Sequence, residues 1–152
     1  MLILSIIDLT ILLFVLMELS NVCILYFAPD SKLGNGVAVF NGWHNAKKQK
    51  ETELFARYMV NWVAGVKLIF IVLLLVIVFT AGIVTKLLAG CVLILSIATY
   101  YFRLNKIITE LDEINEITPK GYSKTLFYMI TAFIIMFTVA VGVEAFLYFN
   151  LR

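Results

Sequence analysis

Residues 68–79 read LIFIVLLLVIVF and are apolar at every position. A strand of a membrane β-barrel would alternate apolar and polar residues, so this unbroken run predicts an α-helix. It lies within a longer apolar stretch, about 54–79, and a helix needs about 20 such residues to cross the hydrocarbon core of a bilayer. The whole chain is 62% apolar with a mean hydropathy of +1.00, which is more than a soluble domain can bury. The sequence therefore predicts an integral membrane protein.

Polar interruptions divide the chain into four predicted transmembrane spans, at about 1–28, 54–79, 83–102 and 122–149. Pro29 and Asp30 form a pair that ends the first helix. The short connection 80–82 makes the second and third spans an antiparallel hairpin. Aromatic residues gather near the expected span ends, as they do where rings meet lipid headgroups. We expect one domain, 1–152, with an all-α fold that forms an integral membrane four-helix bundle.

Lysine and arginine are distributed unevenly between the two sides of this bundle. The first and third loops hold or adjoin eight of them: Lys32, Lys47, Lys48, Lys50, Arg103, Lys106, Lys120 and Lys124. The opposite side holds Lys86 and Arg152. The positive-inside rule then places loops 30–53 and 103–121 in the cytoplasm and both termini outside, in a protein of the cell membrane.

The third loop carries an apolar stripe with three- and four-residue spacing, formed by Leu104, Ile107, Ile108, Leu111, Ile114 and Ile117. This spacing predicts a cytoplasmic amphipathic extension of the third helix over about 104–117, ended by Pro119. We expect the stripe to lie on the first loop or on the bilayer surface.

Polar residues within the spans are the main candidates for function, since a charge at a helix centre costs about 2.5 to 3.5 kcal/mol on insertion scales. With a rise of ~1.5 Å per residue, Glu18 lies ~15 Å and Lys67 ~20 Å from the cytoplasmic end of its span. Asn21 shares a helix face with Glu18, and Arg57 shares one with Asn61. We expect Glu18 and Lys67 to compensate one another, directly or through Asn61 and a bound water.

Two interpretations of this intramembrane group remain open: a structural ion pair with amide hydrogen bonds that hold helices together, or a transport or proton pathway. Asp8 and Glu144 form a second pair of candidates. At the same helical rise they lie ~30 Å or more from the cytoplasmic side, near the outer interface, where a carboxylate can reach water.

Other chemistry is poorly supported by the sequence. A net charge of +2 argues against a nucleic-acid partner. His44 is the single histidine, and a lone histidine does not make a metal site. Cys23 and Cys91 lie in apolar runs without a C-x-x-C spacing. No serine lies on a recognisable strand-to-helix elbow, so we expect no catalytic residue. No cofactor is specified.

Two further motifs resemble binding sites but are interpreted without a ligand. Glu110, Asp112, Glu113 and Glu116 are interpreted as the polar side of the amphipathic helix rather than a cation site. The segment 34–36, Gly-Asn-Gly, lacks the Lys-Ser/Thr ending of a phosphate-binding loop.

Three hypotheses of function follow. The first is a small transporter or channel component, oligomeric, that uses intramembrane Glu18 with Asn21, Asn61 and Lys67 beside it. The second is a non-catalytic membrane subunit or scaffold, whose intramembrane charges pair with another membrane protein and whose loops dock a cytoplasmic partner. The third, a lipid-modifying enzyme, ranks last. Small residues on three spans favour close helix contacts, within the chain or between copies in a homo-oligomer.

Overall fold

The computed structural model describes residues 4–33 and 35–150 of the chain. Its helices are α1 (Ile6–Phe27), α2 (Asn41–Ala46), α3 (Lys50–Thr80), α4 (Ile83–Ala98), α5 (Leu104–Glu113) and α6 (Tyr122–Asn150), with 3-10 turns η1 (Val37–Val39) and η2 (Thr99–Tyr101). Four helical segments are long and apolar enough to cross a membrane: Ile6–Phe27, Lys50–Thr80, Ile83–Glu113 and Tyr122–Asn150. The predicted all-α, four-helix membrane architecture is confirmed. The predicted start of the first span, at about residue 1, lies outside the described residues.

The ends of α1 follow from local side-chain chemistry. Ser5 and Asp8 form a capping box, in which the Ser5 hydroxyl accepts from the backbone N–H of Asp8 and the Asp8 carboxylate accepts from that of Ser5. These bonds satisfy N–H groups that have no partner in the first turn of a helix. At the other end α1 stops before Pro29, whose ring cannot continue a helix.

Helix α3 begins earlier than its apolar stretch. It starts at Lys50 instead of about residue 54, because the charged first turn is stabilised by its own side chains. Glu53 accepts from Arg57 at 2.9 Å, one turn along the helix, and lies 3.5 Å from Lys50. Such pairs, with carboxylates near the positive end of the helix dipole, favour helix beyond the membrane-spanning part.

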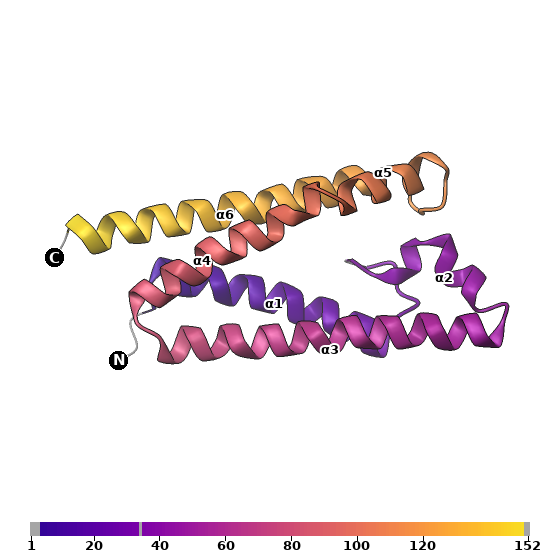
Figure 1. Cartoon of the computed structure of the whole chain (residues 1–152), viewed down its shortest axis with the longest axis horizontal. Helices are drawn as coiled ribbons and strands as arrows, with labels where there is room; N and C mark the ends of the chain where they lie inside the picture. Colours follow the sequence, from indigo (N-terminus) through magenta and orange to yellow (C-terminus); the bar gives the residue numbers. More distant parts are fainter. Residues whose placement is uncertain (1–3, 34, 151–152) are drawn as a thin grey trace.

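The helices pack as two pairs, α1 against α3 and α4 against α6, and α1 also contacts α6. Figure 1 shows α3 and α4 meeting at one end and diverging toward the other, so the predicted hairpin is an open one. We call the end that holds residues 81–82, the start of α1 and the end of α6 the terminal end. The opposite end, which holds residues 28–33, 35–49 and 102–121, is called the loop end.

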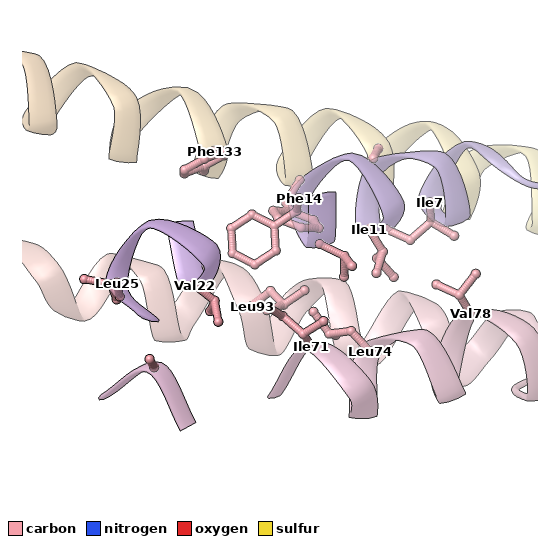
Figure 2. Close-up of a cluster of buried hydrophobic side chains, with 14 residues drawn as sticks. Ile7, Ile11, Phe14, Val22, Leu25, Ile71, Leu74, Val78, Leu93 and Phe133 are labelled. Carbon is pink, nitrogen blue, oxygen red and sulfur yellow. The ribbon is translucent and has the colours of Figure 1, made fainter. Parts of the chain in front are cut away.

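The main core runs along α1 and includes the half of that helix nearest the terminal end. Ile7, Ile11 and Phe137 are fully buried there, and the ring of Phe14 meets that of Phe137 edge-on at 5.3 Å (Figure 2 shows this cluster, with Ile7, Ile11 and Phe14 labelled). At Gly90 the helices approach so closely that an added Cβ would lie 2.6 Å from Val141 Cγ2. Packing therefore closes the bundle at this end.

The predicted helix over 104–117 is wrong in its last four residues. Helix α5 ends at Glu113, and Asn115 has a φ of 61°, in the left-handed region. Beyond it the chain pairs with the first loop: the Asn41 N–H donates to the Glu116 carbonyl at 2.9 Å, and the Thr118 N–H to the Val39 carbonyl at 2.8 Å. These long-range hydrogen bonds replace the helical ones that the periodicity predicts.

The apolar stripe of the third loop is buried only in part. Ile108 and Ile117 are buried in a cluster with Val39 of the first loop, which confirms that part of the stripe lies on that loop. Leu104 and Ile107 are exposed. The α4 helix also ends at Ala98, and α5 starts anew after η2, so the extension is a separate short helix.

Replacing Ile108 with Asp should lower the melting temperature in detergent far more than replacing Glu113 with Ala. Ile108 is 8% exposed, so the change removes a buried side chain worth about 1.5 to 3 kcal/mol and buries a carboxylate in its place. Glu113 is exposed on the same helix and is the matched control. Equal melting temperatures for the two variants would contradict the observed packing of α5.

Candidate functional site

An intramembrane ion pair joins α1 to α3. Lys67 Nζ lies 2.7 Å from Glu18 Oε2 and donates a second hydrogen bond of 2.7 Å to Asn21 Oδ1. Glu18 and Asn21 stand three residues apart on one face of α1, and the long stem of Lys67 reaches both. The expected pairing of Glu18 with Lys67 is confirmed and is direct. The cation that Glu18 holds in this structure is thus Lys67 itself.

The polar network continues from Asn21 into the first loop and α6. Asn21 Nδ2 donates to the carbonyl of Asn35 at 3.1 Å, and the Tyr122 hydroxyl donates to Asn35 Oδ1 at 2.9 Å. Neither Asn35 nor Tyr122 was singled out from the sequence as a site residue. No periodicity could have paired them, since 87 positions separate these two residues.

This network borders a cavity of about 600 Å³ at the loop end, between α1, α4, α5 and α6. The volume falls within the range of small-molecule sites. Its walls are mostly apolar, and its polar lining residues are Glu18, Ser20, Asn21, Asn35, Ser96, Thr99 and Tyr100. Of the described residues that line it, only Glu18 is charged. The arrangement can hold an elongated apolar group with a polar head beside Glu18.

Arg57 and Asn61 lie outside this site, although the sequence grouped them with Glu18. Arg57 pairs with Glu53, and the backbone carbonyl of Asn61 accepts from the Tyr26 hydroxyl at 3.4 Å. Both residues line a separate, smaller cavity of about 120 Å³ that also includes Trp43. Of the two routes expected for the pairing, the direct one is observed, and Asn61 does not lie between Lys67 and Glu18.

A second ion pair lies at the terminal end. Asp8 Oδ1 is 2.7 Å from Lys86 Nζ of α4, and Asp8 is only 2% exposed. The expectation that this carboxylate reaches water is therefore wrong, because the first turn of α4 packs over it. Glu144 is half-buried and accepts from the backbone N–H of Ile6 at 2.9 Å. These two carboxylates thus join the start of α1 to α4 and α6.

The first loop is held at the loop end by Asp30. Its Oδ1 accepts from Lys47 Nζ and from Trp43 Nε1, the latter at 2.7 Å, and Lys47 also lies over the Trp43 ring. The hydrogen bond from Lys47, followed by that from Trp43, holds the pKa of Asp30 below its ordinary value of 3.8. Trp43 is buried, so its ring packs on the protein itself.

Acid should release this loop. A carboxylate whose pKa is lowered by folding stabilises the fold above its unfolded pKa, and that contribution is lost as pH falls through the lowered folded value. We therefore expect the Trp43 fluorescence of a Trp62→Phe background to be constant at neutral pH and to change below about pH 3.8. Asp30→Asn should show the loosened signal already at neutral pH. A pH-independent signal in both proteins would contradict this role of Asp30.

The lone histidine and the acidic cluster of the third loop contact groups of the protein itself. His44 is exposed, and its Nε2 lies 3.1 Å from the Ala38 carbonyl. Asp112 accepts from the backbone N–H groups of Gly121 and Ser123 and from the Ser123 hydroxyl. Within residues 4–33 and 35–150 no group of three His, Cys, Asp or Glu side chains is placed to hold a metal ion.

Comparison with protein-family models, with curated proteins and with solved structures finds no match to this chain. The features that bear on function are therefore the cavity and the Glu18–Lys67 and Asp8–Lys86 ion pairs.

Proposed function

We propose that the protein is a small membrane transporter that carries an amphipathic molecule, with the 600 Å³ cavity as its binding site. The observation that carries this proposal is the asymmetry of the bundle. The cavity lies between diverging helix pairs at the loop end, whereas the terminal end is closed by packing. A carrier that opens to one side at a time would have this arrangement in one of its two states.

The basic loops orient this arrangement in the proposal. By the positive-inside rule the loop end faces the cytoplasm and both termini lie outside, so the cavity serves the cytoplasmic side. The cell membrane is the proposed location.

The terminal end holds the contacts that would have to open in the second state. They are the Asp8–Lys86 ion pair and the close approach of Gly90 to Val141. The ion pair joins α4 to α1, and the close approach joins α4 to α6 beside Ile7 of α1. Helix α1 also contacts α3, so it touches the other three long helices. A tilt of α1 relative to the other helices would loosen this end and narrow the cavity.

Transport by this route is tested in vesicles that contain the purified protein alone. The rate at which a fluorescent single-chain amphiphile crosses the bilayer should rise with protein and fall sharply in Met17→Trp, which fills the cavity. Leu16→Trp is the matched control, because Leu16 directly precedes Met17 in α1, is 64% exposed and does not line the cavity. Equal rates in protein-free vesicles, or in both variants, would contradict the proposal.

The alternative, a non-catalytic subunit or scaffold, is less favoured by the contacts. It expects the intramembrane charges to pair with another membrane protein, yet Glu18 pairs with Lys67 and Asp8 with Lys86 inside this chain. Vesicles without activity, together with a membrane protein that co-purifies in fixed ratio, would favour the alternative.

Self-association stays a prediction. Ala64 and Ala140, two of the small residues expected to mediate close contacts, are buried within the chain. Gly142, in contrast, has open space where a Cβ would stand. We therefore propose transport by the single chain, with oligomer formation to be measured separately.

A further inference from the structure

We infer that the molecule held in the cavity is a neutral amphiphile with a hydroxyl-bearing head group, of the long-chain alcohol or monoacylglycerol class. This inference rests on the proposed role of the cavity as a binding site. The charges, the hydrogen-bonding atoms and the exposed apolar residues around the cavity support this ligand class.

Charge balance argues against an ionic head group. Glu18 is the one charged side chain among the described lining residues, and Lys67 already neutralises it at 2.7 Å from the other side. An ammonium or a carboxylate head would thus introduce a charge with no countercharge among the lining residues. Unpaired charges are strongly disfavoured in surroundings of low dielectric constant, whereas a neutral head leaves the existing pair intact.

The free polar atoms of the cavity favour a group that both donates and accepts. Glu18 lines the cavity and uses Oε2 for Lys67, so its Oε1 can accept a further hydrogen bond. Tyr100 is 6% exposed and lines the cavity, yet its hydroxyl has no partner among residues 4–33 and 35–150. Buried polar groups rarely remain without a partner.

A hydroxyl matches this pair of groups, because it can donate to the carboxylate oxygen and accept from the phenol. A carboxylate head could only accept and would face Glu18 with a like charge. An ammonium head could only donate and would leave the phenol proton unused. A head with two hydroxyls offers a donor to the carboxylate and an acceptor to the phenol.

The cavity also offers apolar side chains that an alkyl chain would contact. The apolar lining includes Phe14 and Phe133, which are buried, and Leu104 and Ile107 of α5, which are exposed. Leu104 and Ile107 are 60% and 54% exposed. An alkyl chain laid along α5 would cover them, and burial of apolar surface favours binding.

The test measures binding of three probes with the same chain length to the purified protein in phosphatidylcholine nanodiscs at neutral pH. The probes are monomyristoylglycerol, tetradecylamine and myristate, each isotopically labelled. We expect monomyristoylglycerol to bind at least about tenfold more tightly than either ionic probe, since a mismatched buried polar group commonly costs that much.

Variants locate the head group. Tyr100→Phe should weaken binding of monomyristoylglycerol about fivefold to tenfold, which is the effect of one neutral hydrogen bond. Tyr101→Phe is the matched control, because the Tyr101 hydroxyl is bonded to Thr131 at 2.6 Å and Tyr101 does not line the cavity. Lys67→Met should move the preference toward tetradecylamine, since Glu18 would then lack a countercharge.

Tighter binding of either ionic probe would overturn the inference while leaving the cavity as the proposed binding site. Equal effects of Tyr100→Phe and Tyr101→Phe would overturn the placement of the head group. If none of the three probes bound saturably, both the inference and the proposed binding role of the cavity would be wrong. Saturable binding without transport in vesicles would overturn the transporter proposal alone.

Discussion

Replacing Lys67 with Met should destabilise the protein by an amount toward the lower end of about 3 to 5 kcal/mol, the usual loss when one partner of a buried ion pair is removed. The variant would leave Glu18 within the bundle with no cation, and Asn21 Oδ1 would lose its donor. The side chains of Lys67 and Glu18 are 25% and 21% exposed, which is why the lower end applies. The measurement is the melting temperature in detergent, or the midpoint of unfolding by a denaturing detergent.

The double variant Glu18→Gln with Lys67→Met should recover much of this loss, because no uncompensated charge remains. The four proteins of this cycle measure the coupling between the two side chains directly. Lys106→Met is a matched control, since Lys106 is exposed and lies outside the bundle core. Additive effects of Glu18→Gln and Lys67→Met would mean that the two residues do not interact.

The same cycle, scored for transport in vesicles, separates the two interpretations of the pair. If Glu18 and Lys67 only hold α1 against α3, a stable double variant should transport at the wild-type rate. If the pair also belongs to the binding site, the double variant should fold but transport poorly. Wild-type transport in Glu18→Gln would contradict any role of that carboxylate in binding.

Asp112→Ala should cause a loss of about 2 to 4 kcal/mol, because it removes the acceptor of three hydrogen bonds at the start of α6. Asp112 is 6% exposed, and its two carboxylate oxygens bind the Gly121 and Ser123 N–H groups and the Ser123 hydroxyl at 2.6 to 3.1 Å. The carboxylate thus caps α6 from the neighbouring helix, where its charge also favours the positive end of the helix dipole.

Glu113→Ala changes the next residue of α5, which is exposed, and should leave the melting temperature almost unchanged. Asp112→Asn keeps one side-chain oxygen as an acceptor, so its melting temperature should lie between those of Asp112→Ala and Glu113→Ala. Hydrogen exchange of the first turn of α6 should accelerate in Asp112→Ala and not in Glu113→Ala. Similar exchange rates in both variants would show that α6 does not depend on this cap.

The sequence by itself determined the class of fold and the approximate spans. Long apolar stretches must cross a bilayer as helices, because a helix satisfies all of its backbone hydrogen bonds within one segment. Local chemistry also places ends such as the stop of α1 before Pro29. The pairing of Glu18 with Lys67 was predictable for a related reason: two opposite charges at similar depth cost too much in lipid to remain apart.

Only the tertiary structure decided which groups surround that pair. Asn21 was expected beside Glu18, but the presence of Asn35 and Tyr122 in place of Asn61 depends on how α1 crosses α3 and on where the first loop returns. The Asp8–Lys86 pair and the end of α5 at Glu113 were likewise decided by long-range contacts. Periodicity records which face of a helix is apolar, but the partner of that face is set by the packing of all four helices together. The cavity exists because these helices diverge at the loop end, a geometry that no single stretch of sequence contains.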